Sequence, residues 1–234
     1  MIKDAINKIL ELAGPKTIAV GDFQYAERDL VPIISPIPDP LIVNTLTGLF
    51  GYVVVLAKGD VGQDSIFIHV YSPILVNVEG ALNKEGQRNI YLTARHELPT
   101  FPFGQWLDTE DFIVKTQTMF VPSDDLDNIV KIVGNMKEES VKTVVDDGVS
   151  QEVTTRTGVA SVEEVEVKRF LNLKPYRTFL EVEQPLSSFI IRLRQPGPTV
   201  ALFEADGGRW RLECIDNIKN WLQYHLGDTV TIIA

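Results

Sequence analysis

The clearest folding signal in this sequence is the stretch Val141-Lys-Thr-Val-Val-Asp-Asp-Gly-Val-Ser-Gln-Glu-Val-Thr-Thr-Arg156. β-Branched residues flank the dipeptide Asp147-Gly148, which supplies the positive φ angles that a tight hairpin turn needs. The stretch therefore predicts two antiparallel strands joined at Asp147-Gly148.

Further extended segments follow this hairpin, and prolines or glycines separate them. Together they predict an antiparallel sheet over residues 140–204. These segments are Val162–Lys168, Phe179–Glu183, Phe189–Arg194 and Val200–Glu204. Earlier strands are expected at Ser65–Tyr71, Ile74–Val78 and Arg88–Arg95.

The first predicted helix, Met1–Ala13, has an apolar stripe formed by Ile2, Ala5, Ile6, Ile9 and Leu10. We expect this stripe to cover one side of the sheet, with an oligomerising arm as the alternative. Further helices are predicted at 46–57, 109–120, 123–137 and 211–226. The last of these places on one face Leu212, Ile215, Ile218, Trp221, Leu222 and His225. The expected fold class is α+β, mainly antiparallel β-sheet with helices packed on one face and an N-terminal amphipathic helix.

The composition fits a folded globular protein. The chain has 234 residues, of which 44% are hydrophobic, so it can bury a sizeable core. We expect one α+β domain over residues 1–234, and we also consider a division into two lobes near residues 109–137.

Charge and cysteine content limit the setting. A net charge of −10 disfavours general coating of nucleic acid. Cys214 is the only cysteine, so neither an intramolecular disulfide nor a cysteine zinc site can form. The first residues lack the apolar run of a signal peptide, and Leu46–Ala57 is too short to cross a bilayer. We expect a cytoplasmic protein without a membrane partner.

The sequence contains no recognisable catalytic centre. It has no Gly-x-Ser-x-Gly elbow and no Walker loop, and its three histidines lack metal-ligand spacing. We therefore expect no catalytic residues, no metal and no cofactor, although enzymatic activity stays an open question. Glu166-Val-Lys168 has the Glu-x-Lys form of metal-dependent nucleases, but this short form also arises by chance in charged strands.

One window is locally basic. Between Lys168 and Arg194 six basic residues face only two acids, Glu181 and Glu183, so the window carries a charge of +4. Interleaved aromatic residues resemble the stacking platforms of single-strand binders. A half-exposed sheet also displays such alternation. The candidate binding residues are Lys168, Arg169, Lys174, Tyr176, Arg177, Arg192 and Arg194.

Two predicted loops have an unusual composition. The segment Leu98-Pro-Thr-Phe-Pro-Phe-Gly-Gln-Trp106 is rich in proline and aromatic residues, and we expect it to lie over hydrophobic surface. The segment Glu204-Ala-Asp-Gly-Gly208 could form a metal turn, but a glycine hairpin turn explains it without any metal.

The order of several segments resembles the YfdQ-like family of uncharacterised phage and prophage proteins. The resemblance is carried by Val43-Asn-Thr-Leu46, Tyr52-Val53, Trp106-Leu107, the long hairpin, Pro175-Tyr-Arg-Thr-Phe179, Pro185 and Ile191-Arg-Leu-Arg194. The chain departs from the family pattern in its proline series from Pro32 to Pro40 and in the residues after Arg194.

The resemblance implies an early phage product acting in the bacterial host cytoplasm, and the family supplies no catalytic residues. We therefore expect a non-enzymatic homo-oligomer that acts by binding. Its partner would be either a host protein, such as an anti-phage defence factor that it blocks, or a small ligand that it sequesters. The alternative is an accessory single-stranded DNA-binding factor in phage recombination or replication.

Overall fold

The computed structural model describes residues 2–13, 17–26, 34, 36–58, 66–137, 143–146, 151–157, 161–167, 170–194 and 198–234. The chain divides into two compact units. The first contains residues 1–39 and 82–89, and the second contains residues 40–81 and 90–234.

The first unit contains a helix and a small hairpin. Helix α1 (Ile2–Ala13) ends where the sequence predicts. Strands β1 (Thr17–Val20) and β2 (Phe23–Ala26) pair antiparallel around Gly21, whose φ of 62° suits a glycine. The stripe residues Ile2, Ile6 and Ile9 are between 51% and 80% exposed. The expectation that this stripe covers one side of the sheet stays a prediction.

The second unit contains a five-stranded mixed sheet in the order β14-β4-β5-β6-β3. Its strands are β3 (Leu41–Val43), β4 (Ile66–Ser72), β5 (Leu75–Leu82), β6 (Arg88–Arg95) and β14 (Thr231–Ile233). The edge strands β3 and β14 pair parallel with their neighbours, whereas β4 and β5 pair antiparallel.

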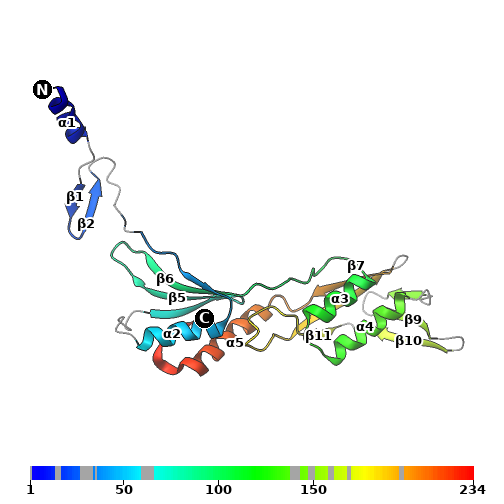
Figure 1. Cartoon of the computed structure of the whole chain (residues 1–234). Helices are drawn as coiled ribbons and strands as arrows, with labels where there is room; N and C mark the ends of the chain where they lie inside the picture. The colour runs from blue at the N-terminus through cyan, green and yellow to red at the C-terminus, as the bar shows by residue number, and fades with distance from the viewer. Residues whose placement is uncertain are drawn as a thin grey trace. The chain divides into compact units, whose positions relative to one another are not determined.

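Helices α2 (Leu46–Lys58) and α5 (Trp210–Leu226) lie on one side of this sheet (Figure 1). A short 3-10 turn, η2 (Gly227–Thr229), follows α5. Alternate strand residues such as Ile68, Val78 and Leu92 meet Leu49 and Ile218 in one core. This arrangement confirms the prediction of helices on one face.

A four-stranded antiparallel sheet has the order β11-β12-β13-β7. Its strands are β7 (Leu107–Asp108), β11 (Leu171–Leu173), β12 (Ser187–Arg194) and β13 (Thr199–Glu204). Helices α3 (Thr109–Met119) and α4 (Asp124–Lys137) pack against one face, with Phe112, Phe120 and Phe189 fully buried between them and the sheet.

The long predicted hairpin is present. Strand β8 (Thr143–Asp146) pairs antiparallel with β9 (Gln151–Thr157), which pairs antiparallel with β10 (Ser161–Val167). The predicted turn at Asp147-Gly148 lies outside the described residues. Antiparallel pairing is prominent throughout, so the α+β assignment is confirmed.

The predicted extended segment Phe179–Glu183 is wrong, because these residues form a turn in which Phe179 and Val182 are buried and Leu180 and Glu183 are exposed. The Val182 amide donates to the Phe179 carbonyl. The buried Gln184 side chain accepts from the amides of Arg177 and Thr178 and donates to the Phe179 carbonyl. A side chain thus makes the backbone hydrogen bonds that a neighbouring strand would otherwise have made.

Candidate functional site

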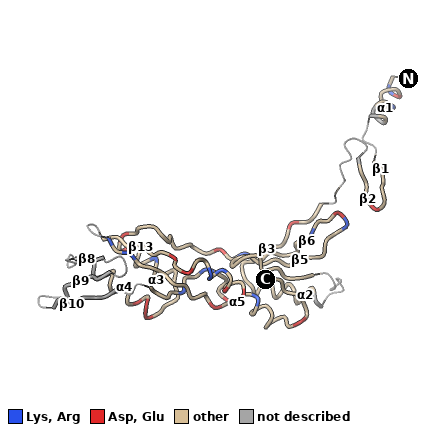
Figure 2. Tube along the Cα trace, turned by 180° about the vertical axis from the view of Figure 1, so that it is seen from behind, with Lys and Arg blue, Asp and Glu red and all other residues tan. Residues whose placement is uncertain are grey.

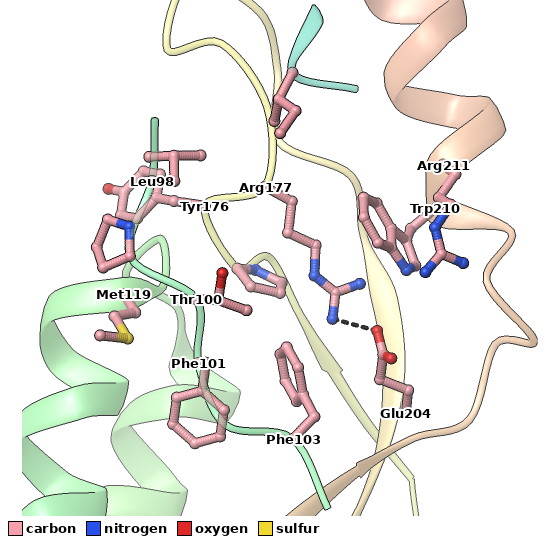
Figure 3. A pocket seen from close by; sticks show the side chains of 13 residues that line it. Leu98, Thr100, Phe101, Phe103, Met119, Tyr176, Arg177, Glu204, Trp210 and Arg211 are labelled. Carbon is pink, nitrogen blue, oxygen red and sulfur yellow. Dashed lines mark hydrogen bonds and ion pairs between the residues drawn. The ribbon is translucent and has the colours of Figure 1, made fainter. Parts of the chain in front are cut away.

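A pocket of about 290 Å³ lies in the second unit, between the loop that follows β6 and the start of α5 (Figure 3). We call it the Arg177 pocket. Most of its wall is apolar, and its principal apolar residues are Ile74, Leu98, Phe101, Phe103, Met119 and Tyr176. Charged and indole groups occupy one end, namely Arg177, Glu204, Trp210 and Arg211. Apolar walls with a few placed polar groups are typical of small-molecule sites.

The guanidinium of Arg177 is the central charged group of this pocket. Its side chain is only 7% exposed, and Nη2 donates to Glu204 Oε1 at 2.6 Å. The guanidinium carbon lies 4.6 Å from the ring centroid of Phe103 and 4.4 Å from that of Trp210. Burial lowers the pKa of Arg177 from its usual value, and the adjacent Glu204 carboxylate opposes that shift. The pocket wall therefore contains a desolvated, internally paired cation.

Backbone contacts on three sides fix the segment that carries Arg177. The Tyr176 amide donates to the Met119 carbonyl at the end of α3. The Arg177 amide donates to Gln184 Oε1 at 2.8 Å, and Thr178 Oγ1 donates to the Pro73 carbonyl. The contacts come from the end of α3, from the Gln184 side chain and from the turn between β4 and β5. Together they fix the backbone from which the Arg177 side chain extends.

Strand register places Glu204 beside Arg177. Glu204 is the last residue of β13 and lies opposite Phe189 of β12. The Phe189 ring stacks on Phe103 with centroids 5.2 Å apart, and the Arg177 guanidinium lies 5.3 Å from the Phe189 centroid. The antiparallel pair β12–β13 therefore sets both the anion and the aromatic support for Arg177.

The turn before α5 supplies the other charged group of the pocket. Arg211 lies with its guanidinium carbon 4.8 Å from the Trp210 ring centroid, so the indole stands between Arg177 and Arg211 (Figure 3). Gly208 has a φ of 83°, and a Cβ there would lie 2.6 Å from Arg211 Nη1. The positive φ favours glycine at this position, whereas the flexible end of Arg211 could shift away from a Cβ. The expected glycine turn is present, but it leads from β13 into α5 and does not form the predicted hairpin.

The predicted basic residues do not form one surface. Tyr176 and Arg177 meet in the pocket, and Lys174 Nζ pairs with Glu183 Oε1 at 2.5 Å. Arg192 is half-buried on β12, and exposed Arg194 lies 4.0 Å over the Trp106 ring centroid. Lys168 and Arg169 lie outside the described residues. Figure 2 shows acidic and basic positions interspersed along the trace from β13 into α5.

The other candidate residues from the sequence form no catalytic or metal-binding group within the described part of the chain. Glu166 is in β10, but its predicted partner Lys168 lies outside the described residues. No group of three potential metal ligands occurs in the part of the chain that the structure describes. Cys214 is buried, and this burial raises its pKa to about 12, so its thiol is neutral at physiological pH.

Sequence reasoning missed several pocket residues. It placed the 98–106 loop over hydrophobic surface, and Phe101 is indeed buried there. It did not connect that loop with Glu204, Trp210 or Arg211, since the connection depends on tertiary packing. The Glu204-to-Arg211 segment carried a usable signal, because two acids, two arginines and a tryptophan surround a glycine pair.

No protein-family model, curated protein or solved structure matches this chain. The YfdQ-like resemblance therefore stays an expectation from the sequence. Among the described helices, none is both long enough and apolar enough to traverse a bilayer.

Proposed function

We propose that this protein acts by binding without catalysis and that it sequesters a small ligand in the Arg177 pocket. The observation that carries this proposal is a recess with apolar and aromatic walls built around the buried Arg177–Glu204 pair. Its volume of about 290 Å³ lies near the lower end of the range for ligand sites.

The state of the charged groups supports binding as the mode of action. Arg177 and Glu204 are bonded to each other, and three aromatic rings surround the guanidinium. A cation held in this way forms a rigid, pre-arranged wall, which reduces the entropy lost when a ligand binds. Because Arg177 and Glu204 are bonded to each other, neither is positioned as a free general acid or base for catalysis.

The setting of this proposal is a phage protein in the bacterial host cytoplasm, as the YfdQ-like resemblance implies. Blocking a host defence factor and sequestering a ligand are two ways to act by binding. The pocket favours sequestration, since a small molecule can occupy it without any contact to a host protein.

Selective retention of a small molecule tests the proposal. The protein would be incubated with the low-molecular-mass fraction of a bacterial lysate, washed, and extracted for mass spectrometry. Thr100 is exposed and lines the pocket, so Thr100→Trp should fill the recess and abolish retention. Thr118→Trp on the exposed face of α3 is the matched control and should retain the compound. Equal retention by both variants, or none by the parent protein, would refute the proposal.

A second candidate function is single-strand DNA binding, as an accessory factor in recombination or replication. The observation favouring it is that Arg192 and Arg194 alternate with core residues on β12, while Arg194 lies over the Trp106 ring. Fluorescence anisotropy of a labelled oligonucleotide at low and physiological salt tests it. Binding that weakens with salt and falls in Arg194→Gln would support it. Absence of binding at low salt would exclude it.

A further inference from the structure

The polar end of the Arg177 pocket has hydrogen-bond donors without acceptors. The Nε1 atom of Trp210 is buried and has no hydrogen-bond partner among the described residues. Arg211 makes no ion pair with any residue that the structure describes, and its side chain is exposed. Buried donors are almost always paired. An unpaired indole N–H next to a guanidinium that makes no ion pair therefore indicates a place where a ligand could supply the acceptor.

The acids of the same turn make no ion pair with Arg211 in the part of the chain that the structure describes. Glu204 Oε1 accepts from Arg177, and Asp206 Oδ1 accepts from the Gly208 amide. Asp206 Oδ2 is buried and has no hydrogen-bond partner among the described residues. Glu204 thus balances the Arg177 charge, whereas the exposed Arg211 guanidinium is open to a group from outside.

The position of Arg211 makes its donors accessible to a ligand. Its guanidinium stacks on the Trp210 ring, and its exposed side chain can swing away from that ring. This movement would uncover the indole N–H, so that both donors could converge on one oxygen-bearing group. A guanidinium and a neutral N–H together select an acceptor with negative charge.

We propose that the ligand is a small apolar molecule carrying one oxyanion, either a carboxylate or a phosphate, with the oxyanion bound by Arg211 and Trp210 Nε1. This proposal rests on the proposed function and specifies the ligand class of the same site. The apolar body would lie against Leu98, Phe101 and Met119, which line the other part of the pocket. Such a division follows the usual design of small-molecule sites, where apolar contact gives affinity and few polar groups fix orientation.

Calorimetric titration with three related probes tests the ligand class. The probes are 2-naphthoate, 2-naphthyl phosphate and the neutral 2-naphthamide. At least one anionic probe should bind about tenfold or more tightly than the amide, as a charge-assisted hydrogen bond would give. The tighter of the two anions identifies the head group.

Two matched variants locate the oxyanion. Arg211→Gln should remove the roughly tenfold preference while leaving amide binding unchanged. Arg209→Gln makes the same charge change at a neighbouring exposed arginine that does not line the pocket, and it should keep the preference. Circular dichroism and thermal melting of each variant would establish that it is folded.

The outcomes separate the two proposals. Equal binding of amide and anions to the parent protein would overturn the oxyanion proposal and leave the pocket function standing, provided Thr100→Trp abolishes it. An anion preference lost equally in Arg209→Gln and Arg211→Gln would also overturn it, because a general field effect would then explain the preference. No binding of any probe would overturn the oxyanion proposal, and the lysate retention experiment decides the pocket function separately.

Discussion

Arg177 lies in the loop between β11 and β12 and pairs with the Glu204 carboxylate at the end of β13. This partner can therefore be changed without altering the segment that carries the arginine. Glu204→Gln would keep the size of the side chain and replace a charged acceptor by a neutral one. The buried guanidinium would then lack its counter-charge, which is more costly than losing an exposed pair. Because Glu204 is 36% exposed, water would compensate in part.

For Glu204→Gln we therefore predict that the free energy of unfolding falls by about 1–2 kcal/mol, measured by urea denaturation. Glu183→Gln is the matched control, because Glu183 is exposed and pairs only with Lys174 on the surface. It should leave the unfolding free energy nearly unchanged. Equal effects from the two variants would show that the Arg177–Glu204 pair is no more important than a surface contact.

Cys214 makes a prediction about alkaline pH. Its thiol is buried at the α5 interface, and burial raises its pKa in the folded state to about 12, whereas an unfolded thiol titrates lower. Above the unfolded pKa the unfolded chain loses the proton first, so the thiol lowers the free energy of unfolding as pH rises toward the folded pKa. Below the unfolded pKa it has no such effect.

The stability advantage of the parent over Cys214→Ala should accordingly shrink as the pH is raised above about 9. Chemical denaturation at matched pH values measures this difference. Iodoacetamide at pH 8 provides an independent check, because the folded protein should resist alkylation and the unfolded chain should react. Rapid modification of the folded protein would contradict the buried, neutral thiol.

At the scale of elements, the Gln184 side chain makes the hydrogen bonds to the turn after Arg177 that a neighbouring strand would otherwise make. Gln184→Met keeps a similar length and removes the amide, which leaves the Arg177 and Thr178 amides without acceptors. We predict a loss of about 2–4 kcal/mol in unfolding free energy. The exposed helical Gln117→Met is the control and should change stability little. A mild effect at Gln184 would mean that water or a shifted backbone satisfies those amides.

The elements differ in how far local sequence determines them. The ends of β6 at Arg88 and Arg95 and the start of α3 at Thr109 agree with the pattern, because alternation and capping act over a few residues. The segment Phe179–Glu183 alternates like a strand, yet Gln184 and the burial of Phe179 hold it as a turn. A tertiary hydrogen bond of this kind leaves no periodic signal.

Helix α5 shows the same limit in its choice of buried face. The pattern suggested a face containing Leu212 and His225, but Leu212 is 66% exposed and His225 is exposed as well. The buried residues are Cys214, Ile218, Leu222 and Leu226. Helical periodicity identifies candidate apolar stripes, and the neighbouring sheet selects among them. The parallel pairing of β14 with β4 depends likewise on a distant partner.

At the scale of the whole molecule, helix α1 allows a test of the expected self-association. Its stripe residues Ile2, Ile6 and Ile9 are exposed, and a second copy of the chain could cover them. We predict an oligomer by analytical ultracentrifugation that Ile6→Lys with Ile9→Lys weakens. Asn7→Lys on the same helix should leave association unchanged. A monomeric parent protein would contradict the expected homo-oligomer.

The candidate site also belongs to this scale, because its parts come from distant segments. The sequence singled out Tyr176 and Arg177, but as members of a basic sheet surface. Their real neighbours, Glu204 and Trp210, reach them through the β12–β13 register and the placement of α5. Local composition could identify charged and aromatic residues, whereas only the folded arrangement shows which charges neutralise each other.

The most direct test of the ligand pocket is a two-dimensional ¹H–¹⁵N spectrum of the indole groups during titration with 2-naphthoate and 2-naphthamide. The protein has three tryptophans, and single Trp-to-Phe variants would assign their indole signals. We predict that a probe shifts the Trp210 signal progressively and leaves those of Trp106 and Trp221 in place, because Trp210 alone of the three lines the Arg177 pocket. Unchanged Trp210 signals at saturating probe, or equal shifts of all three, would contradict a ligand site at Arg177.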